Sequence, residues 1–329
     1  MSPEAEAATQ PAKHSDRPAA LSSQTLAVGD GHELYVETAG NADGLAAVYL
    51  HGGPGSGCQP DHRRLFDPAQ FHAVLFDQRG AGRSRPKGGR EANTLSHLIA
   101  DMELIRETFG FERWLVVGGS WGATLALAYA QAHPERVSGI VLRATFLGTR
   151  DELDQAFLHT LPQLYPALHQ DFLSVLPEHE RAAPLAPYWR RILDPDPAVH
   201  APAARAWGDT ESILSQVAPS RTRLDLTTLA GTRPLPATPF MEAHYFSHDC
   251  FMRPRQLLDG AGALAGIPGI IVQGRYDLLC PPATSHALAA RWPDAEMRIV
   301  EAAGHSLYDP GIRDAVTKAI TDIADKIIT

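Results

Sequence analysis

The sequence predicts an α/β protein: a mostly parallel sheet with helices on both faces, interrupted by an inserted, mainly helical cap domain. Two observations predict this class. Over residues 25–149, short apolar segments alternate with helical stretches, which is the order of a parallel sheet with crossover helices. Residues 150–254 contain helical segments and many prolines but no strand pattern, and the alternation returns over 255–329. We therefore assign 25–149 and 255–329 to one α/β domain and 150–254 to the cap.

The start of the chain is predicted to hold a leader and a hairpin. Residues 1–24 are rich in Ala, Pro and polar residues, which is typical of a disordered leader. A hairpin is expected from residues 26–28 and 34–38, turned at 29–31. Four apolar segments of the buried, parallel type follow, at residues 46–50, 73–76, 114–117 and 137–142.

Helices are predicted between these strands. Apolar side chains recur at helical spacing from Thr94 to Phe109, and an Ala- and Leu-rich stretch covers 123–132. Two late strands, at 269–272 and 297–300, are each followed by a loop and a helix. The late strands therefore extend the same sheet after the cap.

Composition excludes several classes of protein. The 329 residues carry a formal net charge of −9 and the pI is near 5.9, which argues against a nucleic-acid partner. No apolar run approaches the roughly 18 residues of a membrane span. The cysteines, Cys58, Cys250 and Cys280, are few and odd in number, and the first residues lack the apolar region of a secretory signal. We expect a cytoplasmic protein with no membrane partner, and predict no particular oligomeric state.

A G-x-S-x-G motif at residues 118–122 carries the strongest chemical signal, with Ser120 at its centre. It stands between a predicted strand and a predicted helix. A serine on such a sharp turn needs small neighbours, and amides at the helix start favour developing negative charge. The context predicts that Ser120 is a nucleophile.

A serine hydroxyl needs a base that a third group orients. In this class of fold the chain order is serine, acid, histidine. Asp277 follows the predicted strand at 269–272, and His305 follows the one at 297–300. We therefore expect Ser120, Asp277 and His305 to form a catalytic triad. No His, Cys or Asp cluster has metal-ligand spacing, so we expect neither a metal nor another cofactor.

Two loops after earlier strands are predicted to support Ser120. In HGGPG, at residues 51–55, Pro54 has no N–H, so Gly53 is the expected oxyanion donor together with the amide of Trp121. We expect His51 to be structural. DQRGAGRS, at residues 77–84, can bind substrate, but we favour a scaffold loop tied by hydrogen bonds between its acid and its arginines.

Five segments together give a resemblance to a known family: HGGPGSG, DQRGAGRS, GGSWGATLALAYAQAHPERV, GRYDLLCPP and AGHS. From about residue 26 to its end, the chain resembles the proline iminopeptidases (prolyl aminopeptidases), serine peptidases of the α/β-hydrolase superfamily. The resemblance implies the α/β-hydrolase fold and release of N-terminal proline from small peptides through a prolyl-enzyme, without a metal. It maps the triad onto the same three residues.

The resemblance also implies substrate-binding residues. In such enzymes two carboxylates of the cap bind the substrate's amine, one from the E-x-H-Y-F segment and one from a W-x-x-W-E pattern. The first is Glu242 here. In the second segment, WGDTE, Thr210 stands for the second Trp and Glu211 falls on the expected Glu, with Asp209 as the alternative.

Three further residues match positions near the family's pocket. The resemblance implies that Phe146 packs on the pyrrolidine ring and that Arg143 organises the cap carboxylates. Cys280 matches a cysteine beside the pocket, and a buried small apolar residue is the alternative interpretation.

Two other functions stay open. One is an esterase or amidase acting on small acyl compounds, which the acids Glu211 and Glu242 disfavour. The other is a non-catalytic ligand-binding protein on the hydrolase scaffold, which has no need of an intact serine, aspartate and histidine set.

Overall fold

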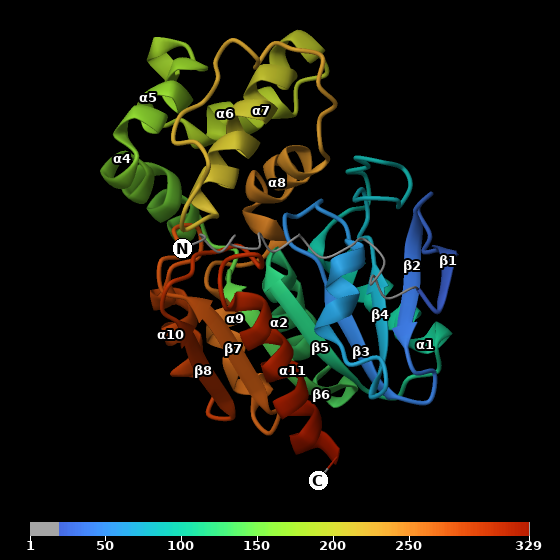
Figure 1. Ribbon diagram of the computed structural model, residues 1–329. Helices are drawn as coiled ribbons and strands as arrows, with labels where there is room; N and C mark the ends of the chain where they lie inside the picture. Colours follow the sequence, from blue (N-terminus) through green and yellow to red (C-terminus); the bar gives the residue numbers. More distant parts are fainter. Residues whose placement is uncertain (1–19, 329) are drawn as a thin grey trace, which may run out of the picture.

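The computed structural model describes residues 20–328, and its centre is an eight-stranded sheet (Figure 1). The strands are ordered β1-β2-β4-β3-β5-β6-β7-β8. Only the β1–β2 and β2–β4 pairs are antiparallel. The predicted mostly parallel sheet is confirmed, with these bounds: β1 Ser22–Ala27, β2 Glu33–Gly40, β3 Leu45–Leu50, β4 Phe71–Phe76, β5 Trp114–Ser120, β6 Val137–Thr145, β7 Gly269–Gly274 and β8 Ala295–Val300.

The predicted leader needs a correction at its end. Strand β1 begins at Ser22, so residues 22–24 belong to the sheet. Most β1 side chains are exposed, so the strand's sequence lacks the apolar alternation of a half-buried strand. The strand is ordered by its backbone pairing with β2. Residues 1–19 of the predicted leader lie outside the described residues.

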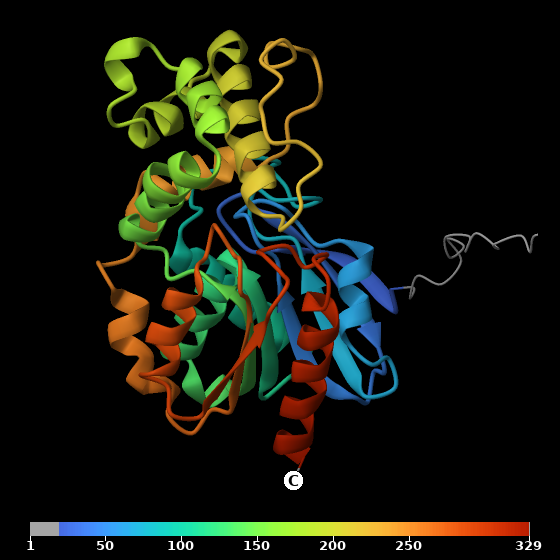
Figure 2. The ribbon, with the colours of Figure 1, turned by 60° about the vertical axis from the view of Figure 1, so that its left-hand side comes forward.

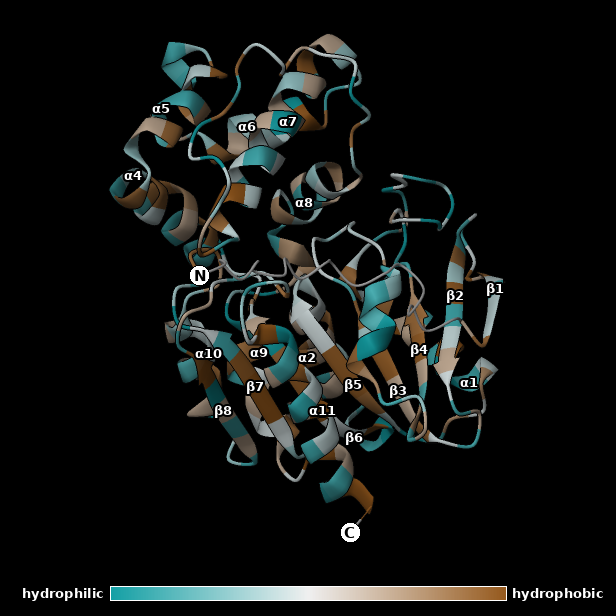
Figure 3. Ribbon diagram, viewed as in Figure 1, coloured by the Kyte–Doolittle hydropathy of each residue, from teal (hydrophilic) through white to brown (hydrophobic). Residues whose placement is uncertain are grey.

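Helices cover both faces of the sheet, as predicted (Figures 1 and 2). Successive β3 side chains alternate between two hydrophobic clusters, because a strand presents neighbouring residues to opposite faces. Val48 packs in the cluster with α1 and α2, and Tyr49 in the cluster with α11. Figure 3 shows strand β7, next to the edge, as largely apolar, whereas edge strand β8 mixes apolar and polar residues. The bounds around the sheet are η1 Pro60–Leu65, α1 Leu95–Thr108, α2 Trp121–Ala132, η2 Pro134–Arg136, α9 Gln256–Asp259, η6 Gly260–Leu264, α10 Pro282–Ala289 and α11 Ile312–Ile328.

Residues 150–254, between β6 and β7, are mainly helical and stand over the carboxyl ends of the strands (Figures 1 and 2). We refer to residues 150–254 as the cap. Its rings stack on one another, with centroids 4.1 Å apart for Phe172 and Tyr188 and 4.5 Å apart for Phe157 and Trp207. The stack holds helix α7 in place. The bounds are α3 Arg150–Asp154, η3 Gln155–Thr160, α4 Leu161–Leu164, α5 Pro166–Ser174, η4 Glu178–Glu180, α6 Leu185–Ile192, α7 Pro197–Leu214, α8 Thr238–Phe246 and η5 Asp249–Phe251.

Candidate active site

A cavity of about 650 Å³ lies where the cap meets the carboxyl ends of the strands. Ser120, His305, Glu211 and Glu242 all line it. Residues far apart in the sequence therefore meet in one space, large enough for a proline residue and part of a peptide.

Ser120 stands on the turn between β5 and α2. Its backbone has φ 57° and ψ −123°, a conformation that few non-glycine residues adopt. A Cβ at Gly118 would collide with the carbonyl oxygen of Gly122, and one at Gly122 with that of Leu50. The two glycines of the motif let the helix pass close to the sheet, and the turn presents Ser120 to the cavity.

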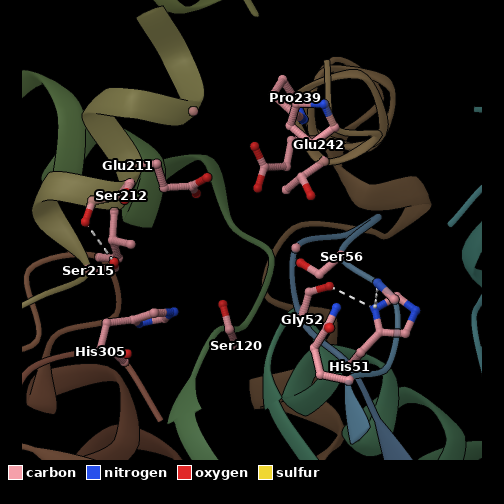
Figure 4. Close-up of a pocket in the computed structure, with 18 of the residues that line it drawn as sticks. His51, Gly52, Ser56, Ser120, Glu211, Ser212, Ser215, Pro239, Glu242 and His305 are labelled. Carbon is pink, nitrogen blue, oxygen red and sulfur yellow. Dashed lines mark hydrogen bonds between the residues drawn. The ribbon is translucent and has the colours of Figure 1, made fainter. Parts of the chain in front are cut away.

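The loops after β7 and β8 bring Asp277 and His305 together. Nδ1 of His305 lies 3.0 Å from Oδ2 and 3.1 Å from Oδ1 of Asp277. Asp277 is buried, and its Oδ1 accepts the N–H groups of Leu279 and Cys280 at 3.0 and 2.8 Å. Figure 4 shows the His305 ring pointing toward Ser120, whose hydroxyl points into the cavity. The arrangement suits a general base held by a fixed acid.

Arg143 contacts the histidine loop. Arg143 lies on β6 opposite Gly119 of β5. Its side chain crosses that glycine, because a Cβ added to Gly119 would lie 2.6 Å from Nη2 of Arg143. The guanidinium donates a hydrogen bond to the carbonyl of His305. Arg143 also lines the cavity with Glu211 and Glu242, so its implied role with the cap carboxylates stays a prediction beside this contact with the histidine loop.

The HGGPG loop lies directly against the nucleophile. A Cβ on Gly52 would be 3.2 Å from the oxygen of Gly119 and 3.5 Å from Cβ of Ser120. Gly53 follows and lines the cavity, while Trp121 begins helix α2. The two expected oxyanion donors thus belong to segments that adjoin Ser120.

Gln78 holds this loop to the start of α2. Its N–H donates to Nε2 of His51 at 3.0 Å, and its Nε2 donates to the carbonyl of His51 at 3.0 Å. Its Oε1 accepts Nε1–H of Trp121 at 2.9 Å. His51 is therefore structural, as expected. Sequence reasoning assigned Gln78 no role of its own, and its place beside Asp77 in DQRG is the only signal for it.

The loop at 77–84 is a scaffold. Asp77 accepts the N–H of Cys58 at 2.7 Å and Nε–H of Arg83 at 2.8 Å. Arg79 pairs with Asp101 at 2.8 Å, both buried. The residues that line the cavity do not include Asp77, Arg79 or Arg83. The geometry of the described residues therefore favours a scaffold loop over a substrate-binding loop.

Two carboxyl groups of the cap meet above Ser120. Figure 4 shows Glu211 from α7 and Glu242 from α8 entering the cavity from opposite sides. Glu242 is fully buried: its Oε2 accepts Nε1–H of Trp207 at 2.7 Å, while its Oε1 has no hydrogen-bond partner within residues 20–328. Burial raises the pKa of both acids, and the charge of Glu211 raises that of Glu242 further.

The structure distinguishes Glu211 from the alternative acid. Asp209 also lines the cavity, but its carboxyl group pairs with Arg221 at 2.8 Å and with Arg233 at 3.5 Å. Glu211 interacts with Glu242 instead. Trp207, the first Trp of the pattern, carried no assigned role in the sequence, yet its indole N–H holds Glu242.

Two residues implied by the resemblance do not line the cavity. Phe146 is buried and packs edge-on against Phe246, with centroids 5.9 Å apart, so its predicted contact with a pyrrolidine ring is not borne out by this geometry. Cys280 is 4% exposed, and burial raises the pKa of its thiol. Its neighbour Leu279 lines the cavity. Of the two interpretations, a buried small residue fits the geometry of Cys280.

Comparisons with known proteins agree on one family. The family model described as the alpha/beta hydrolase fold matches residues 48–311. The chain is 42% identical over 308 residues to a proline iminopeptidase of Neisseria meningitidis, covering 92% of this chain and 96% of that protein. It is 42% identical over 298 residues to a proline iminopeptidase of Arabidopsis thaliana, covering 88% and 77%.

Solved structures share the fold. A proline iminopeptidase-related protein from Thermus thermophilus aligns with a TM-score of 0.59 and 24% identity, covering 92% of this chain and 98% of that one. A thermophilic esterase from Thermogutta terrifontis aligns with a TM-score of 0.63 and 21% identity, covering 94% and 100%. At these identities the likeness extends to the fold alone.

Proposed function

Because the chain belongs to the proline iminopeptidases of the α/β-hydrolase superfamily, we propose that it releases N-terminal proline from small peptides by a serine mechanism. Ser120 is the nucleophile, His305 the base and Asp277 the acid that orients it. The observation that carries the proposal is the pair of cap carboxyl groups, Glu211 and Glu242, in the same cavity as Ser120.

Acylation begins with attack by Ser120 Oγ on the prolyl carbonyl carbon. His305 Nε2 takes the hydroxyl proton, and Asp277, at Nδ1, stabilises the imidazolium. The tetrahedral oxyanion receives hydrogen bonds from the amides of Gly53 and Trp121. The carbon–nitrogen bond then breaks, and His305 gives its proton to the leaving amine.

Deacylation repeats these steps with water. His305 removes a proton from water as its oxygen attacks the prolyl ester. The new tetrahedral intermediate collapses, the ester bond breaks and Ser120 recovers its proton from His305. Free proline leaves the cavity.

The cap acids predict a requirement for a free amine on the substrate. A prolyl ammonium between Glu211 and Glu242 forms charge-assisted hydrogen bonds with both. It also relieves the cost of holding two acids together away from water, a cost that raises their pKa. The unpartnered Oε1 of Glu242 is ready to accept an N–H.

The decisive experiment compares proline with N-acetylproline on one leaving group, in wild type and Glu242→Gln. Acetylation removes the charge, so kcat/KM is expected to fall by about two to three orders of magnitude. Glu242→Gln is expected to lose a similar amount for prolyl substrates and much less for a neutral acetate ester. Equal wild-type values for the two acyl groups would refute the amine anchor and favour the esterase interpretation.

We also propose a cytoplasmic location. In its support, Cys58, Cys250 and Cys280 are all free and buried, which suits a reducing compartment. No helix within residues 20–328 combines the length and apolar character that a membrane crossing requires.

A further inference from the structure

The position of the second residue of a peptide follows from the chemistry at His305. The leaving nitrogen has to lie within hydrogen-bonding distance of Nε2, because that group protonates it. The amine of the proline points toward the cap acids. The second residue therefore lies along the wall beside His305, where Leu307 and Tyr308 of the same loop line the cavity.

Three rings form this wall: Tyr49, His62 and Tyr308, all of which line the cavity. The centroids of Tyr49 and His62 are 4.4 Å apart. Burial raises the pKa of Tyr49, and Tyr308 is among the groups near enough to add to that effect. Arg313 lies 5.1 Å over the Tyr308 ring and is also among the charges that act on His62. Tyr49 therefore neighbours both of the other rings, and Arg313 lies near Tyr308 and His62.

The wall lies on a different side of the nucleophile from the helix that carries Glu242. Tyr49 and Leu307 belong to the hydrophobic cluster beneath α11. Tyr245 of α8 and Trp121, on which it packs, belong to the cluster on the opposite face of the sheet. The rings are thus separate from the amine anchor.

The wall is aromatic, and the charges nearest to it are the guanidinium groups of Arg143 and Arg313. Burial is the main cause that lowers the pKa of His62 to about 4, so its ring is neutral at pH 7. Tyr49 is 6% exposed and forms the base, whereas Tyr308 is 60% exposed and stands at the mouth. An exposed aromatic ring beside a buried one is suited to hold a second ring or an aliphatic chain.

We propose that Tyr49, His62 and Tyr308 form the subsite for the second residue of the peptide, and that it takes an aromatic or large apolar side chain. Tyr308 covers that side chain at the mouth of the cavity. This subsite rests on the proposed function, because His305 as the acid for the leaving nitrogen defines its place.

The test measures kcat/KM for Pro-Phe, Pro-Gly and prolinamide, which share the proline and differ in the leaving part. Wild type is expected to prefer Pro-Phe. Tyr308→Ala is expected to lower kcat/KM for Pro-Phe by about three- to tenfold, the worth of an aromatic contact. The kcat/KM of Tyr308→Ala for Pro-Gly and prolinamide is expected to match that of wild type. Tyr308→Phe is expected to keep the preference for Pro-Phe. The exposure of Tyr308 makes a folding defect a minor concern.

Tyr276 provides a matched control. It is 58% exposed and precedes Asp277, but it does not line the cavity. Tyr276→Ala is expected to keep the ratio of Pro-Phe to Pro-Gly. If Tyr308→Ala keeps the wild-type ratio of kcat/KM for Pro-Phe to kcat/KM for Pro-Gly, or loses kcat/KM equally on all three substrates, the subsite is overturned. The serine mechanism would be unaffected by that result. Full turnover by Ser120→Ala would instead overturn the proposed function itself.

Discussion

Ser120 is the residue on which the proposed chemistry depends. Ser120→Ala removes the hydroxyl and keeps the backbone turn between Gly118 and Gly122. Loss of a triad nucleophile costs on the order of 10⁶ in kcat, so turnover of a prolyl arylamide is expected to disappear. Circular dichroism and melting temperature should match wild type. A folded variant with more than about a hundredth of the activity would place the nucleophile elsewhere.

Glu242, a single residue of the proposed amine anchor, also makes the free energy of unfolding depend on pH. Burial and the charge of Glu211 raise its pKa well above the ordinary 4.5. As the pH rises above the ordinary value of 4.5, Glu242 loses its proton in the unfolded chain but keeps it in the folded protein. The free energy of unfolding therefore declines by up to about 1.4 kcal/mol per pH unit, until the folded carboxyl group also ionises.

Glu242→Gln removes this titration and keeps an acceptor for Trp207. The variant is expected to have a higher Tm than wild type at about pH 8, where burial and the charge of Glu211 penalise the ionised acid, and a similar Tm at about pH 4. The measurement is thermal unfolding at the two pH values. A lower Tm than wild type near about pH 8 would contradict the account.

At the scale of elements, helix α8 sets the height of the amine anchor above the nucleophile. Its Tyr245 donates to Oδ1 of Asn93 at 2.7 Å and packs on Trp121, with centroids 4.5 Å apart. Nδ2 of Asn93 in turn donates to the carbonyl of Gly89 at 2.8 Å. A Cβ on Gly55 would lie 2.9 Å from Cγ of Met241, so the helix rests directly on the HGGPG loop.

Tyr245→Phe removes one of these ties and keeps the ring. It is expected to cost about 1–2 kcal/mol of stability and to lower kcat/KM for prolyl substrates more than for an acetate ester, because Glu242 moves relative to Ser120. Tyr188→Phe is the matched control, since its hydroxyl donates at 2.6 Å to the carbonyl of Phe172 within the cap. It is expected to lose similar stability with no change in the substrate ratio. The same change of ratio in both variants would deny α8 this role.

At the scale of the whole molecule, Arg79 joins segments from several parts of the chain. It pairs with Asp101 on α1, and it donates to the carbonyl of Val28 at 2.9 Å and to that of Ala92 at 2.7 Å. Arg79 and Asp101 are both buried. Removing one partner of a buried pair leaves the other charge without compensation.

Arg79→Ala is therefore expected to lower the free energy of unfolding in urea by about 3–5 kcal/mol. The folded fraction is expected to keep its preference for prolyl substrates, because Arg79 does not line the cavity. Replacing both partners, in Arg79→Met with Asp101→Leu, should be milder than the single change. A loss below about 1 kcal/mol in the single variant would show that the pair is replaceable.

The sequence by itself determined the strands and helices and the chain order of the three predicted catalytic residues. Strand and helix periods are local, so the parallel sheet and the helical stretch between β6 and β7 could be read directly. Ser120, Asp277 and His305 could be placed because each follows a strand, and parallel strands bring their carboxyl ends to one edge. The resemblance supplied Glu211 and Glu242, which local patterns do not distinguish from other surface acids.

Only the tertiary structure decided which side chains meet. The packing of α7 against α8 brings Glu211, and not Asp209, to Glu242, and it places Trp207 behind that acid. Arg143 contacts the histidine loop because of its register on β6. Phe146 packs within the protein core, and β1 is ordered by its pairing with β2. The physical reason is that periodicity specifies the face of an element, whereas contacts between loops and helices depend on how distant elements pack.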